Sequence, residues 1–162
     1  MTISATPPNA DEAMHFAEKY LHLAFAIADR DRAAVDARFA ELFPRNDDET
    51  ALLHTWYAVG VGPVLAGQAL IELAGPGKGE VFALLQKHGS DTGKDPHLLP
   101  AMQSVTTFVN GDQRLSQDII TAHHDVVAAR SGPEAAFEAL CGITWHHLEL
   151  LAFLIQRGAY KR

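Results

Sequence analysis

Residues 133–157 read PEAAFEALCGITWHHLELLAFLIQR and predict a long helix that is apolar on nearly every side. Gly132 and Pro133 mark its start, because proline is favoured at the first position of a helix. A helix with apolar residues all round is normally enclosed by other helices. We therefore expect residues 133–157 to form the central helix of a bundle.

The remainder of the chain predicts more helices and almost no strands, because no stretch alternates apolar and polar residues for long. Helices are expected over residues 11–29, 32–43, 49–59, 63–73, 80–88, 100–109 and 113–130. Asp31 and Asp112 are placed to cap two of them. The expected fold class is all-α, a single-domain bundle of seven or eight helices over residues 11–162. Residues 1–10 are expected to be a flexible N-terminus, and residues 89–96 a loop that divides two halves.

The segment Gly60-Val-Gly-Pro63 interrupts an otherwise apolar helical run. Proline inside a helix removes one hydrogen bond and clashes with the preceding turn. We therefore expect a kink or a break here, with a new helical segment from Pro63. The small residues Gly60, Gly62, Ala66 and Gly67 are expected to let another helix approach closely.

Two short resemblances inside the chain predict an internal duplication. Phe25–Asp29 resembles Phe108–Asp112, where a helix ends on a phenylalanine and restarts at an aspartate, and Thr55-Trp56 resembles Thr144-Trp145. A duplication implies two three-helix units about a pseudo-twofold axis, with Trp56 and Trp145 on the central pair of helices. The alternative is that aspartate caps helices in unrelated places.

Charge and composition bear on partners and location. The chain of 162 residues has a formal net charge of −7, which argues against nucleic acid or a membrane surface as a partner. The N-terminus has no secretory signal pattern, and the apolar run Val59–Ala74 is interrupted by Pro63, Gln68 and Glu72. We expect a cytoplasmic protein. The single cysteine, Cys141, is expected to be a small core residue.

Nine histidines are many for this length, and four of them form the pairs His123-His124 and His146-His147. Neighbouring residues on a helix point about 100° apart, so one member of each pair should face inward. The apolar neighbours select His123 and His147, with His124 and His146 toward polar flanks. Together with His54, these two predict a metal site or a general-base pocket. The alternative is that they are core residues satisfied by hydrogen bonds.

A second site hypothesis is a small-molecule pocket beneath the kink. His54, Tyr57, Gln68 and Glu72 share one side of the helices around Pro63. The two tryptophans of the central pair, Trp56 and Trp145, are added to this pocket.

The segment Leu85-Gln-Lys-His88-Gly-Ser90, followed by Pro96, resembles the proximal-histidine segment of bacterial globins. Phe43 lies upstream at about the spacing of the haem-packing phenylalanine, and the resemblance implies His88 as an axial haem ligand. It covers about twenty residues. The segment from Pro96 to Ser131 is too long for that pattern, and the aromatic signature expected around Phe25 is missing, so we do not assign the family.

No nucleophile or catalytic motif stands out, which favours a non-catalytic helical binding or interaction module. We expect it to self-associate or bind a protein partner, because Phe153 and Ile120 fall where a monomer would expose them. The alternatives are a metal- or haem-dependent small enzyme or sensor that uses buried histidines, and a small-molecule-binding helical pocket. The sequence does not identify a cofactor.

Overall fold

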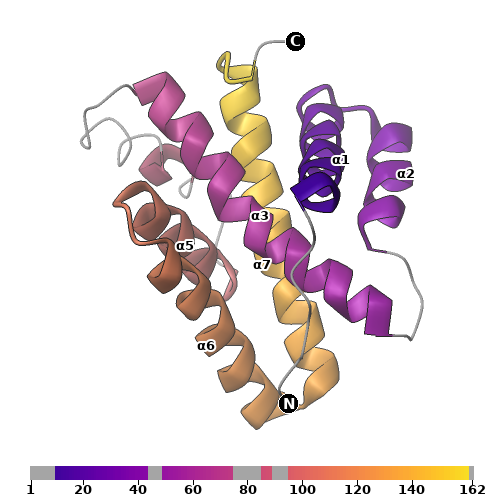
Figure 1. The fold of residues 1–162 in the computed structure, drawn as a ribbon, viewed down its shortest axis with the longest axis vertical. Helices are drawn as coiled ribbons and strands as arrows, with labels where there is room; N and C mark the ends of the chain where they lie inside the picture. The colour runs from indigo at the N-terminus through magenta and orange to yellow at the C-terminus, as the bar shows by residue number, and fades with distance from the viewer. Residues whose placement is uncertain (1–9, 44–48, 75–84, 89–94, 161–162) are drawn as a thin grey trace.

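The computed structural model describes residues 10–43, 49–74, 85–88 and 95–160, and every regular element among them is a helix (Figure 1). The helices are α1 (Ala10–Ala28), α2 (Arg32–Leu42), α3 (Glu49–Ala74), α5 (Leu98–Val109), α6 (Gln113–Ser131) and α7 (Pro133–Gln156), with a short helical segment at residues 85–88. This confirms the expected all-α bundle. Residues 1–9 and 89–94, which carry the predicted flexible terminus and most of the predicted dividing loop, lie outside the described residues.

Helix α7 lies at the centre of the bundle, as its sequence predicts. It packs against α1, α3, α5 and α6, and α3 crosses it diagonally in Figure 1. Its side chains Leu140, Ile143, Leu150 and Leu154 are completely buried. Burying one such side chain contributes roughly 1.5–3 kcal/mol, so this helix supplies much of the stability of the core.

The two outer pairs of helices are arranged alike around the α3–α7 pair. Helices α1 and α2 lie on one side and α5 and α6 on the other (Figure 1). Helix α1 packs against α7 from the other half of the chain, and α5 packs in the same way against α3. The central pair is therefore shared between the two halves, and it carries Trp56 and Trp145, as predicted.

The turns α1–α2 and α5–α6 use the same hydrogen bonds. The backbone bonds Asp29 N to Phe25 O, Arg30 N to Ile27 O and Asp31 N to Ala26 O repeat as Asn110 N to Thr106 O, Gly111 N to Phe108 O and Asp112 N to Thr107 O. Asp31 Oδ1 accepts from Ala34 N at 3.1 Å, and Asp112 Oδ1 accepts from Leu115 N at 2.9 Å. Both predicted caps are confirmed. The counterpart of Asp112 is Asp31 and not Asp29, so the predicted register of the repeat was wrong.

Helix α3 runs through Pro63 without a break, which corrects the expected new segment at this residue. Pro63 still removes the normal donor to the Val59 carbonyl. Packing from neighbouring helices holds the helix together there, and the Gln117 side chain of α6 donates to the Gly60 carbonyl at 3.3 Å. The local rule for proline is overridden because α3 is enclosed on several sides.

The glycines of α3 allow the predicted close approaches. A Cβ on Gly62 would overlap the imidazole of His147 on α7, and a Cβ on Gly67 would overlap the ring of Phe108 on α5. Ala66, between them, is completely buried. These small residues therefore bring α7 and α5 against the backbone of α3.

The segment Thr55–Ala74 of α3 is long and apolar enough, by length and composition alone, to cross a membrane. The apolar run Val59–Ala74 therefore passes this test, although Pro63, Gln68 and Glu72 interrupt it. Side chains of α5 and α7 cover Gly62 and Gly67 within this segment. A helix at the centre of a bundle meets the same test of length and composition.

One of the two residues expected to be exposed lies inside. Ile120 is 1% exposed and packs with Val59, Ala101, Leu140 and Ile143 in a small second core, named here the α5 core. Phe153 is half-buried, with the Arg157 guanidinium 3.6 Å from its ring centroid. The large apolar side chains exposed in the described residues are Met14, Ile71, Leu99, Leu115, Val126 and Phe137.

Candidate functional site

Several titratable side chains meet where the start of α5 contacts α6 and α7. We name this group the histidine cluster, and it consists of Asp95, His97, His123, His146, His147 and Glu149. Asp95 and His97 immediately precede α5, His123 lies on α6, and the other three lie on α7. The cluster therefore joins α6 and α7 to the segment that leads into α5.

The His97 and His123 rings form the most direct contact of the cluster. His97 Nδ1 lies 2.9 Å from His123 Nε2, and the ring centroids are 5.2 Å apart. Since this separation is about the sum of two ring radii and the nitrogen–nitrogen distance, the two nitrogens point at each other. One must carry a proton and the other must be unprotonated for this bond to form. Gly142 on α7 leaves room for the His97 ring, because a Cβ there would overlap it.

His146 lies between two carboxylates. Its Nε2 is 3.5 Å from Asp95 Oδ1, and its Nδ1 is 3.7 Å from Glu149 Oε2. Asp95 Oδ1 also accepts from the His97 backbone N–H at 2.8 Å, and Trp145 Nε1 donates to Glu149 Oε1 at 2.6 Å. Glu149 and Asp95 raise the pKa of His146 above its usual value, against a lowering by burial. His146 was predicted on a polar flank, but it is buried because these groups cover it.

The same contacts stabilise the charged forms of both carboxylates. The nearby His146 imidazole is the largest cause that lowers the pKa of Glu149, and the His97 backbone N–H is the largest cause that lowers the pKa of Asp95. Around His146 the cluster therefore favours one positive charge beside two negative charges.

His147 is completely buried, as predicted, and stays neutral. Its Nε2 lies 3.0 Å from the Ala101 carbonyl and 2.9 Å from Ser104 Oγ, and Ser104 Oγ itself donates to the same carbonyl at 2.7 Å. Burial lowers the pKa of His147 to about 4, with a smaller opposing effect of the Ala101 carbonyl. Its Nδ1 has no hydrogen-bond partner among the described residues and faces the backbone at Gly62. This histidine fixes the start of α5 on α7.

The predicted metal ligands His123 and His147 contact different partners. His123 is half-buried against His97, and its pKa is lowered by burial and by the charge of His97. The side chain of His54 lies outside the described residues. Among the side chains that are described, no three histidines, cysteines, aspartates or glutamates are grouped to hold a metal ion. A metal site with His54 stays a prediction.

The residues of the predicted pocket point toward different helices. Tyr57 meets Phe16 of α1, Trp56 meets His124 of α6, and Trp145 meets Phe39 of α2, all edge to face. Gln68 and Glu72 are exposed on α3, where Gln68 accepts from Tyr160 at 3.4 Å. The described members of the predicted pocket therefore contact different helices, and a pocket that also includes His54 stays a prediction.

His88, the haem ligand that the globin resemblance implies, lies in the helical segment at residues 85–88. It is buried with its ring edge-on to Phe153, at a centroid distance of 5.5 Å. Its charge contributes to the low pKa of Glu149, so it lies near the histidine cluster. Haem binding by His88 stays a prediction.

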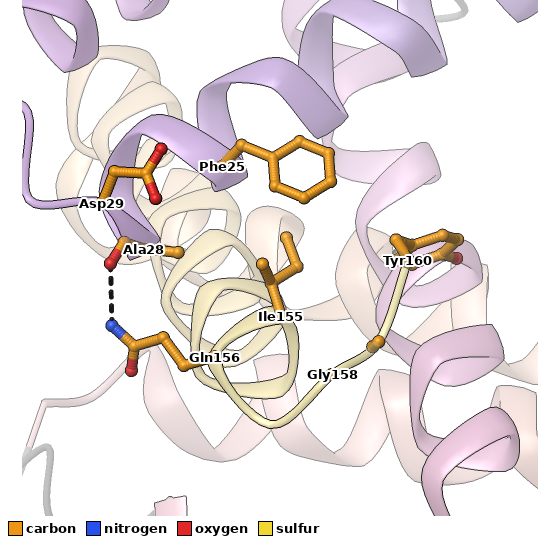
Figure 2. Close-up of a pocket in the computed structure, with 8 residues that line it drawn as sticks. Phe25, Ala28, Asp29, Ile155, Gln156, Gly158 and Tyr160 are labelled. Carbon is orange, nitrogen blue, oxygen red and sulfur yellow. Dashed lines mark hydrogen bonds between the residues drawn. The ribbon is translucent and has the colours of Figure 1, made fainter. Parts of the chain in front are cut away.

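A cleft opens between the C-terminal ends of α1 and α7 (Figure 2). Its volume is about 410 Å³, and its lining consists of Phe25, Ala28, Asp29, Ile155, Gln156, Gly158, Ala159 and Tyr160. Figure 2 shows the Phe25 ring above Ile155 and the Tyr160 ring to the right of Ile155, with Asp29 on the side of Phe25 away from its ring. No residue of the predicted pocket lines this cleft, although Gln68 contacts its Tyr160.

Sequence reasoning missed four members of these networks: Asp95, His97, Ser104 and Glu149 as a partner of Trp145. Asp-Pro-His at residues 95–97 precedes an apolar helical run, and α5 begins at Leu98, two residues before the expected Pro100. An aspartate just ahead of a helix is the signal that could have identified Asp95. The sequence held no signal for the contact of His97 with α6.

Comparison with known protein families, characterised proteins and solved structures gives no significant match for this chain.

Proposed function

We propose that the chain is a non-catalytic helical binding module that acid opens at the start of α5. The observation that carries this proposal is the hydrogen bond of 2.9 Å between His97 and His123. This bond joins the first residue ahead of α5 to the middle of α6 and exists only while at least one ring is neutral. Histidine is the side chain whose charge changes in the range between about pH 5 and 8.

The His97–His123 pair can take up one proton and keep its hydrogen bond, but a second proton breaks this bond. A singly charged pair keeps a charge-assisted hydrogen bond, and Asp95 lies close enough to His97 for their charges to interact. Two charged rings have no acceptor between them, and their centroids are 5.2 Å apart. At an effective dielectric constant of about 20, their repulsion is roughly 3 kcal/mol. His97 also occupies the N-cap position of α5, where the helix dipole disfavours a positive charge.

The groups around the pair set the direction of the response. Asp95 precedes α5 and lies 3.5 Å from His146 of α7, which is itself 3.7 Å from Glu149, and on α6 His124 is paired with Asp125 at 3.0 Å. Burial and the charge of His97 lower the pKa of His123, so its proton is taken up below the usual histidine range. The closed arrangement is therefore favoured above about pH 6.5 and is lost as the pH falls further.

Opening the start of α5 would uncover the α5 core. Ala101 leaves with α5, and Val59, Ile120, Leu140 and Ile143 remain on α3, α6 and α7 as an apolar surface. An exposed apolar patch of this kind is typical of a protein interaction site. The proposed module thus presents its binding surface in acid and covers it at neutral pH.

Hydrogen exchange of the α5 backbone tests this proposal. In buffer with EDTA, the opening equilibrium of α5, corrected for the intrinsic exchange rate, should rise by about 10- to 100-fold between neutral and mildly acidic pH. His123→Gln keeps an acceptor for His97 and should lose most of this response. His124→Gln, at the next position on α6, is the control and should keep it.

Two results would reject the proposal. One is equal protection of α5 at both pH values in the unmodified protein. The other is an acid response of undiminished size in His123→Gln, which would place the titrating group elsewhere. A response that disappears when Zn²⁺ is added would favour the predicted metal site instead.

A further inference from the structure

We propose that the surface which α5 leaves in acid binds a helix of a partner protein, and that this helix carries two small residues and an aromatic residue on one face. The proposed opening of α5 is the condition for this binding. At neutral pH the same surface already holds a helix, which is α5 itself. The contacts of α5 therefore define what a partner helix must offer.

Two side chains of this surface donate hydrogen bonds to the main chain of α5. His147 of α7 donates to the Ala101 carbonyl at 3.0 Å, and the Ser116 hydroxyl of α6 donates to the Ser104 carbonyl at 2.6 Å. Such close contact with a helix backbone needs small side chains on that face, and Ala101 and Ser104 are completely buried here. Leaving a buried donor without an acceptor is unfavourable. The surface therefore favours a helix with small residues at two positions three apart.

Apolar contacts fix the size of the side chains at both ends of this face. Ala101 packs in the α5 core with Val59, Ile120, Leu140 and Ile143. These residues are almost completely buried, so a larger side chain in place of Ala101 would overpack them. Seven positions further along α5, the Phe108 ring lies against Gly67 of α3, where a Cβ would overlap it. Positions i, i+3 and i+7 share one side of a helix, so a single face can carry all three residues.

In acid, a partner helix with a neutral side chain at the position of His97 has an advantage over α5. Helix α5 brings His97 against His123, and this pair loses its hydrogen bond when both rings are charged. A neutral residue there allows the same apolar contacts without the repulsion. Asp95 leaves together with α5. The other titratable groups of this region stay in place on α6 and α7, whichever helix is bound: His124, Asp125, His146, His147 and Glu149. Helix α5 is therefore the stronger competitor at neutral pH and the weaker one in acid.

The probe is a synthetic peptide of residues 98–110 with blocked termini. It keeps the buried face of α5, lacks His97 and contains no titratable side chain, so any pH dependence belongs to the protein. Its binding to the full-length protein is measured by fluorescence anisotropy in buffer with EDTA. The apparent affinity scales with the fraction of protein in which α5 is open. We therefore expect it to rise about 10- to 100-fold from pH 7 to pH 5, in step with the hydrogen exchange of α5, and to lose most of this rise in His123→Gln.

Substitutions in the peptide test the pattern and leave the protein unchanged. Ala101→Leu in the peptide should weaken binding at pH 5 by at least about 10-fold, because leucine overpacks the α5 core. Phe108→Ala in the peptide should weaken it about 10-fold, because the ring contact with Gly67 is lost. Gln103→Ala is the matched control, since Gln103 is exposed on α5, and this peptide should bind like the original.

Three results would overturn the helix recognition. One is no binding of the peptide at pH 5 although α5 exchanges faster there, which would leave the acid opening intact. Another is equal binding at pH 7 and pH 5, which would mean that α5 does not compete for the surface. The third is equal affinity of the original and the Ala101→Leu peptide, which would indicate unspecific apolar contact. Failure of the acid opening itself is seen separately, as unchanged protection of α5 without any peptide.

Discussion

The buried His147 should make the stability of the protein depend on pH in a defined direction. Its folded-state pKa is lowered from 6.5 to about 4 by burial. The neutral ring therefore contributes stability that is fully present above about pH 6.5 and is lost as the pH falls toward its folded pKa. At about 1.36 kcal/mol per pKa unit, the complete loss is about 3 kcal/mol, and the part lost between pH 7 and pH 5 is about 2 kcal/mol.

The assay is urea unfolding of the unmodified protein and His147→Gln across this pH range. Glutamine can still donate to the Ala101 carbonyl but does not titrate, so His147→Gln should be less stable at pH 7 by roughly 1–3 kcal/mol. This difference should shrink by about 2 kcal/mol at pH 5. His146 acts in the opposite direction, since its raised pKa gives stability that is lost as the pH rises. That contribution is common to both proteins and cancels.

His124→Gln is the control, because His124 pairs with the exposed Asp125 and not with α5. The stability difference between His124→Gln and the unmodified protein should not shrink by this amount between pH 7 and pH 5. A stability difference between the unmodified protein and His147→Gln that stays constant from pH 7 to pH 5 would refute the reasoning. It would mean that His147 binds protons equally in the folded and unfolded chain.

Two other predictions concern α3 and the single thiol. Gly60→Ala should stabilise the protein by up to about 1 kcal/mol, because its nearest neighbour to a new Cβ is Gln117 Oε1 at 3.5 Å. Gly62→Ala on the same helix should destabilise the protein by about 1–3 kcal/mol, because the new Cβ would overlap His147. Urea unfolding measures both stability changes. Changes of the same sign in the two variants would contradict the packing described for α3. Burial, followed by the charge of Glu138, raises the pKa of Cys141 to about 11. Its reaction with a disulfide reagent near pH 7 should be roughly 100-fold slower than that of free cysteine, and a rate like that of free cysteine would show an accessible thiolate.

The sequence predicted the helices well because their ends carry local signals. Asp31 and Asp112 cap helices as expected, and Gly132-Pro133 begins α7. The apolar composition of α7 also predicted its central place. The break at Pro63 was wrong, since a rule about one residue and its preceding turn does not include the neighbouring helices that pack on the same segment.

The contacts of the histidines were predicted less well, for a geometric reason. Helical periodicity shows which side of its own helix a histidine occupies, and this identified His147 as buried. It does not show which neighbouring segment faces that side. His123 therefore meets His97, and His146 lies beside Asp95; both of these partners belong to the segment that precedes α5. The expectation that Ile120 is exposed was wrong for the same reason. Periodicity along α6 does not show that α5 and α7 cover this residue.

The packing of α1 against α7 and of α5 against α3 has a consequence for synthesis of the chain. A ribosome completes α1, α2 and α3 well before it has translated residues 133–156, which form α7. Until then the nascent chain lacks the helix that encloses its first half. Its apolar surfaces remain accessible to chaperones, or to neighbouring nascent chains, until the second half of the chain has been translated.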